Sequence, residues 1–69
     1  MVLPPFEELT PLYEAAQIGY IEGIKQEVVP LQKLDYKYTK FTDRILKLAD
    51  SFEYEDVVKL VDRYFLEKS

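Results

Sequence analysis

Histidine and cysteine are both absent from this chain of 69 residues. Without them the chain lacks the commonest general acid–base group, the thiol nucleophile and the usual ligands of a structural zinc site. It can form no disulfide bond either. A domain this small therefore depends on helix packing for its stability, and no reaction that needs an imidazole or a thiol can take place on it.

Glycine and positive charge are also scarce. The chain has two glycines and no glycine-rich loop that would bind phosphate. Nine basic residues face thirteen acidic ones, for a net charge of −4, which argues against nucleic-acid binding. Apolar runs reach two or three residues, so we expect no membrane insertion. The absence of cysteine fits a reducing compartment, and we expect a cytoplasmic location.

Apolar residues make up 48% of the chain and recur at the three- and four-residue spacing of an α-helix. No stretch shows the alternation of a half-buried β-strand. Four helical stretches follow one another through short connections, an arrangement typical of antiparallel neighbours. We therefore predict an all-α fold with one domain, residues 1–69: a small four-helix antiparallel bundle with kinked helices, preceded by an extended segment at residues 1–5.

Two prolines fall inside the first two helical stretches and predict bends there. The first stretch ends at Gly19, a residue suited to the left-handed turn that closes a helix. Pro11 either kinks this helix, which we favour, or occupies its first turn behind Thr10 as the capping residue. The second stretch covers roughly residues 20–34, and Pro30 removes one of its backbone hydrogen bonds.

The third stretch has the clearest helical pattern, with its apolar stripe running from Tyr38 to Phe52. The fourth covers roughly residues 55–66, with acids at its start and a lysine after its end, as the helix dipole favours. Truncation of Phe41 or Phe52 to alanine is expected to cost about 3–5 kcal/mol. The core predicted from the four stripes consists of Leu12, Ala16, Ile21, Ile24, Val28, Leu31, Tyr38, Phe41, Ile45, Leu48, Phe52, Val57, Val61 and Phe65.

Carboxylates are the most abundant ionisable groups, and we interpret their clusters as helix caps or solvated faces. A catalytic carboxylate pair needs a cleft, for which a chain this short has little room. The alternating pattern of a calcium-binding loop is missing. We predict no catalytic residue, no metal site, no cofactor and no enzymatic activity.

The triplet Asp50-Ser51-Phe52 resembles the modification site of acyl and peptidyl carrier proteins. In that family a serine at the start of a helix carries a phosphopantetheine arm. Only 18 residues follow Ser51, fewer than a carrier domain has there, and Ser51 falls at the predicted end of a helix. A carrier domain modified on Ser51 is one alternative function, and a stand-alone helical adaptor that binds a peptide partner is another.

Six tyrosines are many for a chain of this length, and tyrosine is enriched at protein interfaces. The other interpretation is that they are half-buried rings whose hydroxyls reach water. Tyr36 precedes the third helix and is out of phase with its stripe, and Tyr54 lies in the last connection. We predict an interaction surface at Tyr36 and Tyr54, used for docking or for a weak homodimer.

Three short motifs occur in order along the chain. They are Leu-Tyr-x-x-Ala-x-x-Gly at residues 12–19, Asp-x-x-Tyr-x-x-Phe at residues 35–41 and Leu-Ala-x-x-Phe at residues 48–52. Together they resemble the small C-terminal helical module of bacterial hybrid sensor histidine kinases, above all those of cyanobacterial type. The resemblance covers roughly residues 4–66. The chain departs from it at Pro11 and Pro30, and at Tyr20, where the family often has aspartate.

The resemblance implies a place in two-component signalling without catalysis in this segment. It implies a non-catalytic accessory module that docks against a receiver domain or the kinase core of the same kinase, or that associates with a second copy. The kinase ATP-binding region, the dimerisation helix and the receiver aspartate would all lie outside these residues.

This module should accept no phosphoryl group from a receiver domain. Helical phosphotransfer domains use a histidine on a helix face, and the chain has none. Incubation with a phosphorylated receiver carrying labelled phosphate checks the prediction, and stable label on the chain would contradict it.

Overall fold

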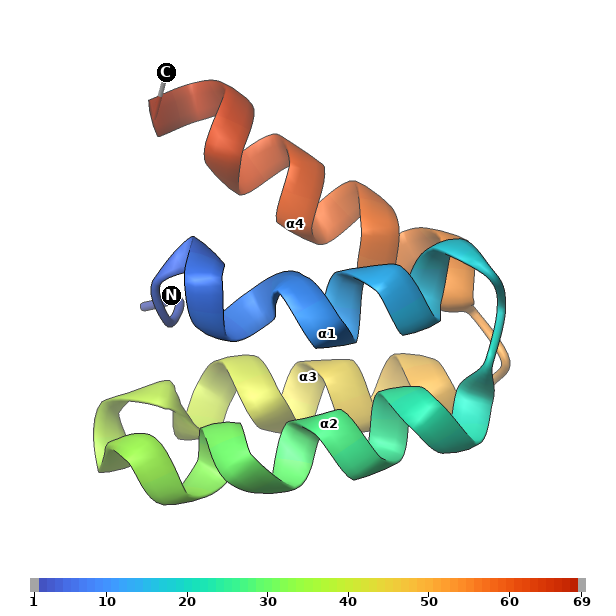
Figure 1. The fold of residues 1–69 in the computed structure, drawn as a ribbon, viewed down its shortest axis with the longest axis horizontal. Helices are drawn as coiled ribbons and strands as arrows, with labels where there is room; N and C mark the ends of the chain where they lie inside the picture. The colour runs from blue at the N-terminus through green and yellow to red at the C-terminus, as the bar shows by residue number, and fades with distance from the viewer. Residues whose placement is uncertain (1, 69) are drawn as a thin grey trace.

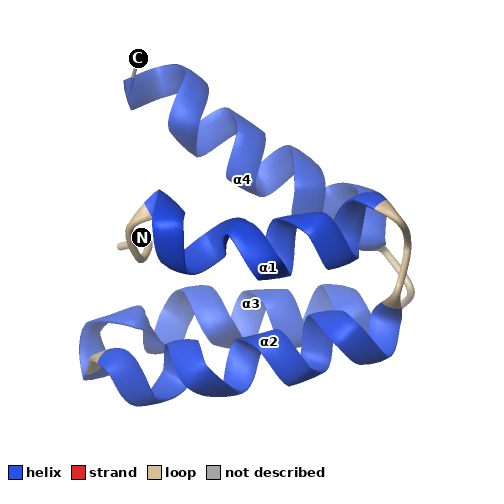
Figure 2. Ribbon diagram, viewed as in Figure 1, coloured by secondary structure: helices blue, strands red, loops and turns tan. Residues whose placement is uncertain are grey.

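The computed structural model describes the backbone of residues 2–68 and the side chains of residues 2–64, and its helices follow the apolar spacing of the sequence (Figure 2). No strand occurs in this part of the chain, so the predicted all-α fold is confirmed. The elements are α1 (Phe6–Gln17), α2 (Ile21–Leu34), the short 3₁₀ helix η1 (Tyr36–Tyr38), α3 (Thr39–Asp50) and α4 (Tyr54–Lys68).

Each helix packs against the one before it in the chain, and α4 also packs against α1 (Figure 1). In Figure 1, α1, α2 and α3 lie close to a common direction, whereas α4 crosses them obliquely and moves away toward its C-terminal end. The connections α1–α2 and α3–α4 lie at one end of the molecule, and η1 lies at the opposite end. The molecule measures 26 × 25 × 18 Å along its principal axes.

One apolar core takes side chains from all four α-helices. Ile21 and Leu48 are half-buried and pack against this core. Phe65 was also predicted to belong to it, but its side chain lies outside the described residues. The predicted core residues that the structure buries are Leu12, Ala16, Ile24, Val28, Leu31, Tyr38, Phe41, Ile45, Val57 and Val61.

The placement of Phe52 in the core is wrong. Its side chain is 72% exposed, because α3 ends at Asp50 and the chain turns before Phe52. The backbone of Phe52 has a φ of +58°, in the left-handed region that bulky residues rarely adopt. The apolar stripe therefore stops where the helix ends. Phe52 lies two residues beyond that end and points into solvent.

The two successive helix pairs, α1–α2 and α3–α4, bury equivalent positions. Residues separated by 33 positions in the sequence correspond to one another in the two pairs. The matched buried residues are Leu9 and Thr42, Leu12 and Ile45, Ala16 and Ala49, Ile24 and Val57, and Val28 and Val61. The matching extends to the turns, where Gly19 of the first pair corresponds to Phe52 of the second.

Pro11 lies inside α1 and Pro30 lies inside α2. Thr10 also lies inside α1, where its hydroxyl donates a hydrogen bond of 3.1 Å to the carbonyl of Phe6. The alternative in which Thr10 caps a helix beginning at Pro11 is therefore wrong. The helix begins directly after Pro5. A proline is tolerated at the start of a helix because the N–H groups of the first turn have no partner within the helix, and proline has no N–H.

The two phenylalanines that we expected to be equivalent should behave differently. Phe41→Ala removes a fully buried ring and should destabilise the fold by about 3–5 kcal/mol. Phe52→Ala removes an exposed ring and should change stability by about 0.5 kcal/mol or less. Urea denaturation followed by circular dichroism measures both values. A large loss of stability in Phe52→Ala would contradict the position of Phe52 in this structure.

Candidate functional site

The described side chains contain no group of three or more acidic residues placed to hold a metal ion. No helix of the described residues is long and apolar enough to cross a membrane. Ser51 is exposed at the C-terminal end of α3, and its backbone N–H donates to the carbonyl of Lys47. We build the candidate site from the exposed apolar side chains.

The two tyrosines that were predicted as candidates for an interaction surface lie at opposite ends of the molecule. Tyr36 is 90% exposed in η1, where the side chain of Asp35 accepts a hydrogen bond of 3.0 Å from the N–H of Lys37. Tyr54 is 36% exposed at the start of α4. All of α3 lies between them, and they occupy opposite ends of the molecule (Figure 1). Tyr36 and Tyr54 therefore do not share a surface.

A different set of exposed apolar residues gathers at the end that contains the two helix–helix turns. Ile18 and Tyr20 flank the turn between α1 and α2, and Phe52 and Tyr54 flank the turn between α3 and α4. Ile18 is 77% exposed and Tyr20 is 52% exposed, beside the 72% of Phe52. We call these four residues the turn face: Ile18, Tyr20, Phe52 and Tyr54.

Both turns of the turn face are closed by the same backbone hydrogen bonds. In the first, the N–H of Gly19 donates to Ala16 at 3.1 Å, and the N–H of Tyr20 donates to Ala15 at 2.9 Å. In the second, the N–H of Phe52 donates to the Ala49 carbonyl at 3.0 Å, and the next N–H donates to the Leu48 carbonyl at 2.8 Å. This pattern requires one residue with a positive φ, and glycine is the usual choice.

The two turns are held together by a tyrosine ring packed on a glycine. A Cβ atom on Gly19 would lie 3.3 Å from ring atoms of Tyr54, so the ring occupies the space that a side chain would fill. Gly23 serves a second ring in the same way, because its missing Cβ would lie 2.5 Å from the ring of Tyr20. The space beside Gly23 is thus filled by a tyrosine of the preceding turn.

Phe52 occupies the position where the matched turn has glycine. Gly19 adopts a φ of +72° without a side-chain penalty, whereas Phe52 adopts +58° with a bulky side chain. The ring of Phe52 is exposed, so burial does not compensate for the backbone strain. Residues held in such unfavourable backbone conformations cluster at functional sites.

The sequence contained a signal for Phe52 that the periodicity argument missed. Alignment of residues 12–24 with residues 45–57 places Phe52 opposite Gly19, the predicted helix-ending residue. Ile18 gave no such signal, because an isolated apolar residue near a helix end is common on surfaces.

The surroundings of Phe52 are acidic. Glu53, Glu55 and Asp56 are all exposed and lie within four residues of it in the chain. Asp50 is exposed too, but it pairs with Lys25 at 2.9 Å, and this contact raises the pKa of the lysine. The second turn therefore presents an aromatic ring flanked by carboxylates.

Comparison of the chain with known protein families, curated proteins and solved structures finds no match. The resemblance to the sensor-kinase module stays a prediction. A function is therefore proposed below from the geometry of the surface.

The matched turns predict opposite effects on stability. Phe52→Gly relieves the left-handed backbone strain and should stabilise the fold by about 1 kcal/mol. Gly19→Ala introduces the same strain and also presses a Cβ against the Tyr54 ring, so it should destabilise by about 1–2 kcal/mol. Thermal unfolding of both variants beside the unmodified chain tests the pair. A lower melting temperature for Phe52→Gly would show that the Phe52 ring stabilises the fold.

Proposed function

We propose that this chain is a non-catalytic helical interaction module that docks to another protein domain through its turn face. The resemblance in sequence motifs suggests the setting: a cytoplasmic hybrid sensor histidine kinase of bacterial type, whose receiver domain or kinase core supplies the docking partner. We also propose that the helices pack as an antiparallel bundle with bends at Pro11 and Pro30.

The observation that carries this proposal is the exposed, strained Phe52. Its matched position in the first helix pair has glycine, which would close the turn at lower conformational cost. An exposed phenylalanine contributes little to folding, whereas an aromatic ring at the centre of an interface contributes strongly to binding. A side chain that is unfavourable for the isolated fold is explained if its ring is buried by a partner.

The charge around the turn face indicates the chemistry of that partner. Glu53, Glu55 and Asp56 line an open hollow together with Phe52, so a partner surface should combine an apolar patch with lysine or arginine at its edge. Two copies meeting face to face would bring these carboxylates together, and like charges at an interface disfavour that arrangement. Docking onto a different surface is therefore favoured over a symmetric pairing of two turn faces.

Substitution of Phe52 should separate binding from folding. Phe52→Gly should weaken docking by about tenfold or more, because the aromatic contact is lost, while the fold is as stable as before or more stable. Calorimetric titration of the chain with the receiver domain and the kinase core of hybrid sensor kinases from the same genome measures the affinity.

Tyr36→Ala is the matched control, since it removes an even more exposed aromatic ring from the opposite end of the molecule. It should leave docking unchanged. If Tyr36→Ala abolishes docking and Phe52→Gly does not, the binding surface lies at η1. If neither domain binds at all, docking onto these kinase domains is wrong.

A further inference from the structure

A second hollow lies beside the turn face, between α1 and α2. This α1–α2 hollow is open to solvent and has a volume of about 540 Å³. Ile18 and Tyr20 of the turn face are part of its lining. Two further lining residues, Ala15 and Gly23, are buried. Because their side chains are a methyl group and a hydrogen atom, the surface between the two helices is sunk below the larger side chains around it.

The charged residues that line the α1–α2 hollow are acidic. Glu14 of α1 and Glu27 of α2 belong to its lining, and none of the described side chains there is basic. The sequence around it is one-sided as well, since residues 1–24 contain four glutamates and no lysine or arginine. Lys25, the first basic residue of the chain, pairs with Asp50 of α3 at 2.9 Å. The α1–α2 hollow therefore combines apolar surface with negative charge.

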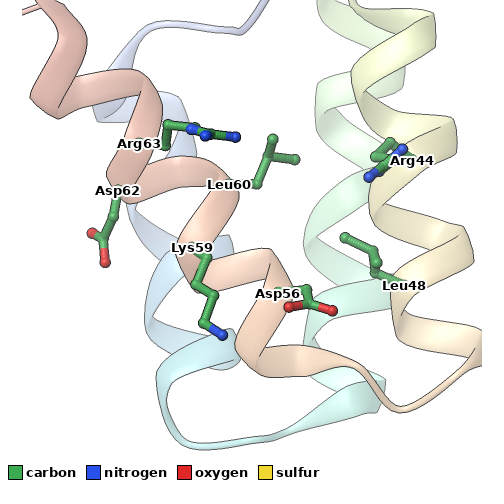
Figure 3. Close-up of a pocket in the computed structure, with 7 residues that line it drawn as sticks. All are labelled: Arg44, Leu48, Asp56, Lys59, Leu60, Asp62 and Arg63. Carbon is green, nitrogen blue, oxygen red and sulfur yellow. The ribbon is translucent and has the colours of Figure 1, made fainter.

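A larger groove between α3 and α4, of about 820 Å³, differs because residues of both charges line it (Figure 3). Arg44 and Lys59 are part of its lining, but the carboxylate of Asp56 points into it as well. Its charge therefore favours neither an acidic nor a basic occupant, whereas the charge of the α1–α2 hollow favours a basic one.

The α1–α2 hollow is continuous with the turn face. Tyr54 lines the hollow of the second turn together with Phe52, and the ring of Tyr54 packs on Gly19. Gly19 lies between Ile18 and Tyr20 in the chain, and these two residues line the α1–α2 hollow. Both hollows combine apolar side chains with carboxylates, so one basic partner can cover them together.

We propose that the α1–α2 hollow binds a basic amphipathic helix of the partner that docks on the turn face. Covering the hollow takes Glu14 and Glu27 out of water, which is unfavourable unless the occupant supplies cations to pair with them. A groove between two packed helices runs along them, and the apolar face of a third helix is suited to fill it. Lysines or arginines on the two sides of that face would meet the two glutamates, which come from different helices. This inference rests on the proposed docking function and names the part of the partner involved.

A synthetic peptide tests the hollow directly. The probe is a peptide of about 18 residues with leucines on one helical face and lysines elsewhere, and the reference peptide has glutamate in place of every lysine. Titration into the isotope-labelled chain is followed by amide chemical shifts. The lysine peptide should move the resonances of the residues that line the α1–α2 hollow, and added salt should weaken its binding. The glutamate peptide should not bind.

Two double variants separate the charge of the hollow from the charge of the whole chain. Glu14→Gln with Glu27→Gln removes the carboxylates of the hollow and should weaken binding of the lysine peptide by about fivefold. Glu7→Gln with Glu8→Gln makes the same change in net charge on exposed residues at the other end of α1. This control should change the affinity by less than about twofold, because charges outside the contact are screened. Circular dichroism shows whether both variants are folded.

Equal loss of affinity in the two double variants overturns the proposal, because it would show attraction to net charge alone. Shifts confined to residues 52–56, or no binding of the lysine peptide, overturn it too. So do shifts at the hollow that appear when the chain is concentrated without peptide, since a second copy would then be the occupant. Docking onto kinase domains through Phe52 is measured separately, so failure of this inference leaves the proposed function standing.

Discussion

Burial of one apolar core by all four α-helices is the interaction on which the rest of this domain depends. No disulfide bond or zinc site can stabilise the chain, because it has neither cysteine nor histidine. The core takes Phe41 and Ile45 from α3, and Val57 brings α4 into it. On α4 the Asp62 carboxylate also accepts a hydrogen bond from the Tyr13 hydroxyl of α1, which raises the pKa of that tyrosine. These contacts hold α4 to α1 and thereby set both the groove and the turn end.

The two successive helix pairs, α1–α2 and α3–α4, can be compared with each other. Their buried positions coincide at a separation of 33 residues, and their turns close with the same backbone hydrogen bonds. At the one position that requires a positive φ, the first turn has Gly19 and the second has Phe52. The glycine is also required by the Tyr54 ring packed against it, whereas nothing in the fold requires the phenylalanine. That difference between equivalent positions is why we assign Phe52 to binding.

The distribution of charge is more informative than its total. A net charge of −4 describes an acidic protein, yet both arginines line one groove between α3 and α4, and Glu53, Glu55 and Asp56 line an open hollow with the exposed Phe52. Interactions between exposed charges are screened over about 8 Å at physiological ionic strength, so a partner responds to the local surface. Neither surface carries a histidine, the residue that helical phosphotransfer domains use.

The sequence by itself determined the absence of imidazole and thiol chemistry, the all-α fold and most of the predicted core residues, because these follow from composition and from a local period of three to four residues. It misplaced Phe52, since the period continues past the residue at which the helix ends. It could not tell that the length of α3 keeps Tyr36 and Tyr54 at opposite ends of the molecule. Only the tertiary structure decided which turns share an end and that Arg44 and Arg63 share a groove. Those relations depend on how the helices pack across long separations in the chain, and local spacing contains no record of them.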